Sequence, residues 1–228
     1  MKVGFLAAAA ALTAFAAASA SAAVIIVKSS GPSARGFPAG KALPDSQRLT
    51  LKANDLVVLL DSRGTRTLRG PGSFSAASTG PARSTSSLAA LTGQGRVRGR
   101  VGAVRGPVPR SIWQASADRS ETMCFANPTD ISLYRDSIAT AETVTIRDAA
   151  TGKSAKANFA AQMQTAPWPT DLPITANGQY MIGNSTVSMK SIAPLPAGLE
   201  GIAQSLIRND CQGQLDILIN TFTIASTE

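Results

Sequence analysis

The longest predominantly apolar stretch of the chain lies near its beginning. Val3 to Ala17 form a run rich in alanine after the single positive charge of Lys2, and small-residue cleavage motifs follow at Ala18-Ser19-Ala20 and Ala20-Ser21-Ala22. An uncleaved membrane anchor is the alternative, but alanine inserts weakly and the cleavage motifs follow directly. The pattern predicts a secretory signal peptide over residues 1–22 and a periplasmic or secreted location.

Four segments after this run have patterns typical of strands. Val24 to Val27 are mostly β-branched, Gln47 to Leu51 alternate between polar and apolar side chains, and Leu56 to Leu60 are continuously apolar, as in a central strand. Asp61 to Gly64 predict a hairpin turn that leads into a partner strand over Thr65 to Leu68.

Hydrophobic residues become sparse between Ser75 and Ser111. The segment consists mainly of Ser, Thr, Ala, Gly and Pro, which offers too little apolar surface to offset the entropy of ordering. It contains six arginines and no acid, so we predict a basic linker over residues 75–111. These candidate anion-binding residues are Arg83, Arg96, Arg98, Arg100, Arg105 and Arg110. The alternation in residues 96–101 leaves a short edge strand as the structured alternative.

The pattern changes again in residues 112–228. Strands are predicted at residues 122–125 and 131–134, around a turn at 127–130. Two hairpins are predicted, one joining residues 143–147 to 155–159 and one joining 179–182 to 186–189. Apolar residues then recur at the i, i+3, i+4 spacing of amphipathic helices in Leu199 to Ile207 and in Leu215 to Ile219.

Composition agrees with this pattern. Gly, Pro, Ser and Thr are abundant while Glu is sparse, which favours short strands and turns over long helices. The predicted fold class is mainly β: a small β-roll or SH3-like module, followed by a β-rich domain capped by C-terminal α-helices.

The two cysteines, Cys124 and Cys211, are far apart and lie outside any CxxC motif. In an oxidising compartment such a pair predicts one disulfide, which would join the first helical segment's end to the strand at 122–125. A zinc site is the weaker alternative because two thiols without histidine are too few ligands. We therefore predict no metal and no cofactor.

Charge is divided between the two parts of the chain. Residues 24–119 contain 15 Lys and Arg against 4 Asp and Glu, a net charge of +11, whereas residues 120–228 have a net charge of −4. This asymmetry favours either contact between the two parts or attraction of the basic part to an external polyanion.

Residues 24–74 contain the run Gly40-Lys41-Ala42-Leu43-Pro44-Asp45, the strands predicted at 48–51 and 56–60, and a turn and strand that end at Gly70-Pro71-Gly72. With these motifs the segment resembles the small β-domain of FecR-like periplasmic proteins. The resemblance implies a compact β-module used for contacts and identifies no catalytic site. The membrane-spanning and anti-sigma segments of that family have no counterpart here.

Because the chain has no histidine, catalytic triads that use histidine, imidazole acid/base chemistry and histidine-based zinc centres are excluded. Lys153-Ser154-Ala155-Lys156 lies in a predicted hairpin rather than in the helix that a serine-lysine mechanism uses. Carboxylates suitable for a hydrolase occur, but most lie beside turn residues; they are Asp130, Asp136, Glu142, Asp148 and Asp171. Four aromatic residues, Trp113, Tyr134, Trp168 and Tyr180, are predicted to anchor the core rather than to bind sugars.

These observations predict an exported, non-enzymatic envelope protein that acts through contact with an unidentified protein partner, as the accessory or sensing part of a larger assembly. One alternative is an adhesive module that binds anionic lipids or acidic polysaccharides, not nucleic acid, through the arginine-rich linker. The other alternative is a hydrolase that uses carboxylates.

Overall fold

The computed structural model describes residues 24–77 and 111–223. In the first range the elements are β1 (Val24–Ser30), the 3-10 helix η1 (Ala34–Gly36), β2 (Ala42–Leu43), β3 (Arg48–Leu51), β4 (Leu56–Asp61), β5 (Gly64–Arg69) and β6 (Gly72–Ser75). In the second range they are β7 (Gln114–Ser116), β8 (Glu121–Phe125), the 3-10 helix η2 (Pro128–Asp130), β9 (Ser132–Tyr134), β10 (Glu142–Asp148), β11 (Ser154–Phe159), β12 (Thr165–Pro167), β13 (Gln179–Ile182), β14 (Ser185–Ser191), α2 (Gly198–Arg208) and α3 (Gln212–Thr221).

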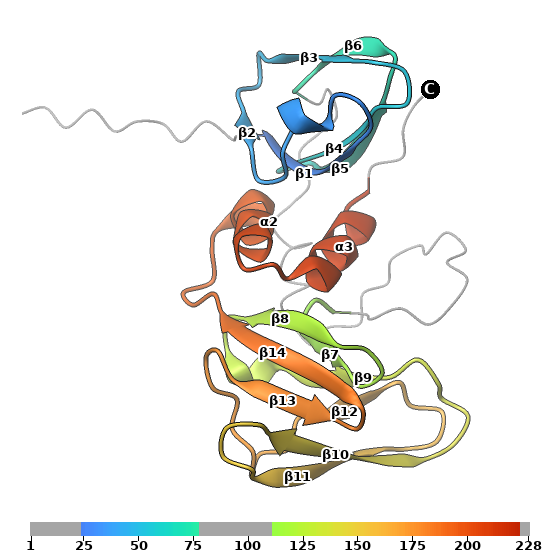
Figure 1. Ribbon diagram of the computed structural model, residues 1–228, viewed down its shortest axis with the longest axis vertical. Helices are drawn as coiled ribbons and strands as arrows, with labels where there is room; N and C mark the ends of the chain where they lie inside the picture. Colours follow the sequence, from blue (N-terminus) through green and yellow to red (C-terminus); the bar gives the residue numbers. More distant parts are fainter. Residues whose placement is uncertain (1–23, 78–110, 224–228) are drawn as a thin grey trace, which may run out of the picture.

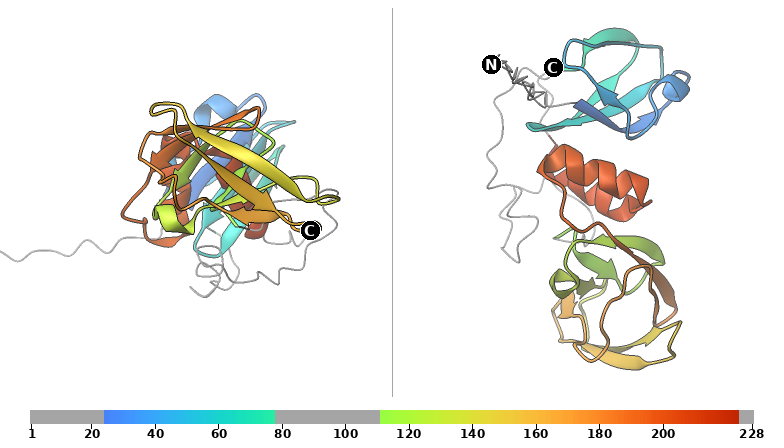
Figure 2. Two further views of the ribbon diagram at one scale, coloured as in Figure 1. Left: turned by 90° about the horizontal axis from the view of Figure 1, so that it is seen from below. Right: turned by 90° about the vertical axis from the view of Figure 1, so that its left-hand side faces the viewer.

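The elements form three layers along the long axis of the molecule. Figure 1 shows the N-terminal β-module (β1 to β6) at one end, the helices α2 and α3 in the middle, and the C-terminal β-domain (β7 to β14) at the other end. The predicted class, mainly β with two C-terminal helices that cap a β-rich domain, is confirmed. The helices also cover a second sheet, because the N-terminal module packs on their opposite side (Figure 2).

The N-terminal module contains a four-stranded sheet, in the order β2-β1-β4-β5, and the pair β3-β6. Successive side chains of a strand point to opposite faces. Ile26 and Leu59 therefore enter the core of the module, whereas Ile25 and Leu60 on the other face join the core that contains the helices. Both faces of β1 and β4 are buried, which explains why these segments are continuously apolar in the sequence.

The two helices supply the apolar layer between the β-structures. Buried Leu199, Ile202 and Leu206 of α2 and buried Leu215 and Leu218 of α3 belong to this shared core. Their spacing is the one predicted from the sequence, so the amphipathic interpretation of both segments is confirmed.

Polar contacts at Thr65 also hold the N-terminal module to the helices. The backbone N–H of Thr65 donates to the carbonyl of Phe222 at 2.8 Å, and its hydroxyl donates to the carbonyl of Ile219 at 2.7 Å. Thr65 also forms a parallel bridge with Thr223. The edge strand β5 is thereby fixed to the end of α3.

The C-terminal β-domain contains a five-stranded sheet, β11-β10-β13-β14-β8, and a three-stranded sheet, β12-β9-β7. The hairpins β10–β11 and β13–β14 form as predicted. The strands β8 and β9, which flank the predicted turn at 127–130, both form but lie in different sheets. Strand β8 pairs in parallel with β14, and β9 pairs in parallel with β7.

Several predicted features lie outside the described residues. They are the signal peptide and all six arginines of the basic linker. Within residues 24–77 and 111–223, neither helix has the length and apolar character that a membrane crossing requires.

Candidate functional site

The predicted disulfide is present. Cys124 of β8 and Cys211, immediately before α3, are bonded, with their Cα atoms 5.9 Å apart. Gln214 supports the same junction: its side-chain carbonyl accepts from the backbone N–H of Cys124 at 2.6 Å, and its amide donates to the carbonyls of Cys124 at 2.8 Å and Ile112 at 2.6 Å. All of these groups are buried, so the bridge and the amide together fix the helical layer to the C-terminal domain.

Four candidate carboxylates of the hydrolase alternative make separate local contacts, and the fifth, Asp171, is exposed in a loop; the four are Asp130, Asp136, Glu142 and Asp148. Glu142 and Asp148 begin and end β10, which places them about 20 Å apart at the usual rise of a strand. Paired catalytic carboxylates lie about 5–9.5 Å apart. Asp148 accepts from the backbone N–H groups of Ala150 and Thr151, and the bond from Ala150 lowers the pKa of Asp148 despite the opposing effect of burial. Asp136 lies 3.7 Å from the guanidinium of Arg119.

The remaining catalytic and aromatic candidates have structural positions. Ser154 begins the strand β11, so it does not lie on a helix with a following lysine. Trp113, Tyr134, Trp168 and Tyr180 are all buried. The indole of Trp168 packs edge-on against Tyr180 with ring centroids 5.2 Å apart and donates to a backbone carbonyl. The four aromatic residues are core anchors, as predicted. In the described ranges, no group of three or more His, Cys, Asp or Glu residues is placed to hold a metal ion.

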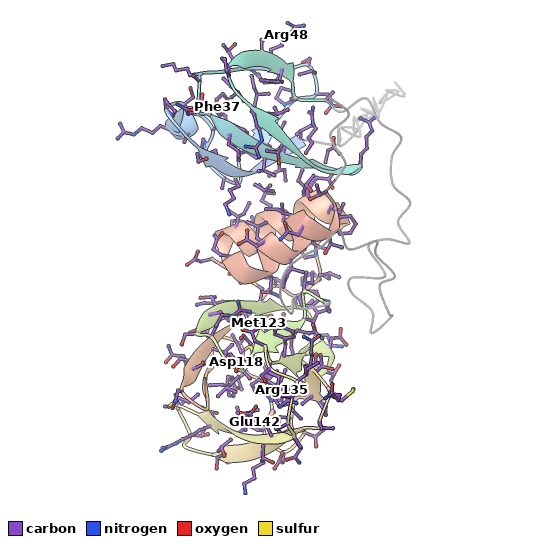
Figure 3. The ribbon with its side chains drawn as sticks, turned by 90° about the vertical axis from the view of Figure 1, so that its right-hand side faces the viewer. Phe37, Arg48, Asp118, Met123, Arg135 and Glu142 are labelled. Atoms are coloured by element: carbon purple, nitrogen blue, oxygen red, sulfur yellow. A yellow bond between two sulfur atoms is a disulfide. The ribbon has the colours of Figure 1, made fainter. Side chains whose placement is uncertain are left out.

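The most unusual polar residue of the C-terminal domain is Arg135, whose side chain is only 2% exposed. Its Nε donates to the carbonyl of Met163 at 3.1 Å and its Nη2 donates to the carbonyl of Ala160 at 2.9 Å. Its Nη1 pairs with Glu142 at 3.2 Å, and its guanidinium lies 4.9 Å from the ring centroid of Phe159. Figure 3 places Arg135 and Glu142 close together in this domain. A charge can be buried there because each side of the guanidinium has a partner.

Arg135 organises two neighbouring loops, residues 136–141 and 160–164, which we call the paired-loop tip. The backbone N–H of Gln162 donates to the carbonyl of Ile138 at 2.8 Å and joins the two loops. Ile138 is 37% exposed and Met163 is 52% exposed. The tip therefore presents two apolar side chains to solvent from a backbone that a buried cation holds in place, an arrangement suited to protein contact.

The sequence did not indicate this tip. Arg135 follows a predicted strand and could as well have been a solvated surface residue, since nothing in its neighbours marks it as buried. Ile138 and Met163 are isolated apolar residues among Ala, Ser, Thr and Gln, and single exposed apolar residues are common. Only the hydrogen bond between the two loops places Ile138 and Met163 on the same tip.

A pair of acids lies near the contact between α2 and the N-terminal module. Asp61, at the end of β4, is 6% exposed and accepts from the backbone N–H of Arg63. Glu200, in the first turn of α2, has one carboxylate oxygen buried without a protein partner among the described residues. Burial raises the pKa of Glu200; the backbone N–H of Glu200 opposes this rise, and the charge of Asp61 adds to it.

This pKa shift predicts a pH dependence of stability. A carboxyl whose pKa is raised by folding contributes most to the free energy of unfolding below its unfolded pKa. That contribution is lost as the pH rises through the folded pKa. We expect Glu200→Gln to be more stable than the parent protein at pH 7 and to lose less stability between about pH 4 and pH 7. Urea unfolding at several pH values measures this. Asp171→Asn, at an exposed loop position, is the control and should leave the pH profile unchanged. An unchanged profile for Glu200→Gln would contradict the prediction.

No family model matches the chain, and no curated protein or solved structure is significantly similar to it. The resemblance of residues 24–74 to FecR-like domains therefore stays a prediction.

Proposed function

We propose that this is an exported, non-enzymatic envelope protein that binds another envelope protein through the paired-loop tip, as the accessory or sensing part of a larger assembly. The carrying observation is that buried Arg135 bonds to two carbonyls of loop 160–164 and pairs with Glu142 at the end of loop 136–141, while Ile138 and Met163 are exposed on these two loops. A site ordered before binding loses little conformational entropy when a partner arrives. Apolar side chains on such a site are typical anchors of protein interfaces.

The disulfide supports the exported location. Such bridges persist in the periplasm and outside the cell, and they are rare in the cytosol, where thiols are kept reduced. The predicted signal peptide leads to the same compartment. A FecR-like N-terminal module would fit a role in contacts, because that resemblance implies no chemistry.

Site-specific photo-cross-linking in the native envelope tests the proposed contact. With a photoreactive residue at Ala139, inside the tip, we expect one adduct of defined mass. The double variant Ile138→Asp/Met163→Asp should reduce its yield about tenfold or more, because each charge would be buried against the partner. Absence of the adduct, or an adduct that the double variant leaves intact, would show that the tip is not the contact.

The matched control is Leu195→Asp, which is compared with the single variant Met163→Asp. Leu195 is 40% exposed and lies elsewhere on the C-terminal part, so the control adds the same charge away from the tip. It should leave the adduct intact, whereas Met163→Asp should reduce the yield. Equal loss in both single variants would indicate a general effect of added charge and would overturn the proposed site.

A further inference from the structure

A second surface of the molecule has a distinct chemical character. It is the outward face of the five-stranded sheet, defined by the side chains that alternate with the buried core positions. We call it the basic sheet face. Its residues are Thr122, Thr143, Thr145, Arg147, Ser154, Lys156, Asn158, Gln179, Met181, Thr186, Ser188 and Lys190.

The charges on this face contrast with those of the surrounding chain. Residues 120–228 carry 6 Lys and Arg against 10 Asp and Glu. Three of those cations, Arg147, Lys156 and Lys190, lie on the basic sheet face, while none of the acids that the structure describes does so. Glu142 and Asp148 of β10 share the inward parity of the buried Val144 and so point away from the face. The fold therefore separates positive charge from negative charge.

The three cations extend across the sheet and do not converge on a single point. Thr145 pairs with Lys156, and Arg147 pairs with Ser154. Arg147 and Lys156 are therefore diagonal neighbours, whose Cα atoms in such a pair of strands lie about 7–8 Å apart. Lys190 lies toward the far end of β14, where its ammonium contacts the side chain of Asn177 at 3.3 Å. Such spacing suits an extended anion more than a compact one.

The face is open. Figure 1 places β10 and β11 at the end farthest from the N-terminal module, and the view from that end shows no described element over them (Figure 2, left). None of the ion pairs found between described residues involves Arg147, Lys156 or Lys190. An external anion would therefore meet these cations without displacing an internal carboxylate.

We infer that the basic sheet face binds an acidic polysaccharide. The cations match the charge of a carboxylated glycan, and the hydroxyl and amide side chains between them, such as Thr145, Asn158 and Gln179, can hydrogen-bond to sugar hydroxyls. A membrane-binding face would insert several large apolar side chains, whereas Met181 is the one such residue among the positions of this face. The residues of this site differ from the linker arginines and from those of the paired-loop tip.

Binding to polygalacturonate, with neutral dextran as the reference polymer, tests this inference. Full-length chains are compared in a background with the six linker arginines changed to serine, so that the linker does not contribute. In this background we expect binding to polygalacturonate that weakens with salt. Arg147→Gln/Lys156→Gln/Lys190→Gln should weaken it about tenfold.

The control Arg48→Gln/Lys52→Gln/Arg69→Gln removes the same charge from exposed positions of the N-terminal module, and it should weaken binding by less than about threefold. Hydrogen exchange on the unsubstituted protein should show protection by polygalacturonate in β10, β11 and β13, a result that does not depend on the folding of any variant. Equal loss in both triple variants, no binding in the linker background, protection elsewhere, or retention only on vesicles of anionic lipid would overturn the inference.

Discussion

Changing Cys124 and Cys211 together to alanine is expected to lower the free energy of unfolding by about 4–5 kcal/mol. The bridge spans a sequence separation of 87 residues, and a cross-link over so long a loop removes much of the conformational freedom of the unfolded chain. Both sulfur positions are fully buried, so alanine is preferred to serine, which would bury a hydroxyl group. Urea unfolding of the oxidised protein and of the double variant measures the difference.

Reduction of the parent protein provides a control for this prediction. The reduced parent and the double variant should have similar midpoints of urea unfolding, since both lack the covalent bond. A double variant as stable as the oxidised parent would show that the buried contacts around β8 and α3 hold the junction without the bridge.

The second large effect is expected at Gln214, which is 4% exposed. Gln214→Leu keeps a similar volume but leaves the backbone N–H of Cys124 and the carbonyls of Cys124 and Ile112 without their side-chain partner. Each unsatisfied buried group costs about 1–3 kcal/mol, so we expect destabilisation of about 3–5 kcal/mol. Thermal and urea unfolding measure it.

Gln212→Leu is the matched control for this change. Gln212 begins the same helix but is exposed, and its amide contacts only Asp210 among the partners found. Its loss should alter stability by about 0.5 kcal/mol or less. If Gln214→Leu were equally mild, the three hydrogen bonds would have little net effect on folding.

The elements that could be predicted from the sequence are those with a strong local pattern. Leu56 to Leu60 form a strand because their apolar, branched side chains suit a sheet buried on both faces, and α2 forms where apolar residues recur at helical spacing. The disulfide followed from the number of cysteines. Four short strands, β2, β6, β7 and β12, were missed, because alternation over four residues or fewer is hard to tell from a loop. The equally short β3 and β9 were predicted.

The arrangement of the elements could not be predicted in the same way. Alternation shows that Ile25 and Ile26 point to opposite faces, but it does not show that one face meets helices from the end of the chain. The parallel pairing of β8 with β14 joins segments separated by about sixty residues. Turn residues predict only the pairing of strands that are adjacent in sequence, so they could not indicate this pair. The paired-loop tip depends on a buried cation, and burial of Arg135 is set by carbonyl groups of a distant loop.

The central position of α2 and α3 has a consequence for biogenesis. Residues 25–60 leave the ribosome long before residues 199–222, which make the surface that covers Ile25 and Leu60. Until those residues arrive, one face of the early sheet is uncovered and prone to aggregation. We expect the nascent chain to need a holding chaperone during this interval, and that requirement would ease only when the last helical turn docks.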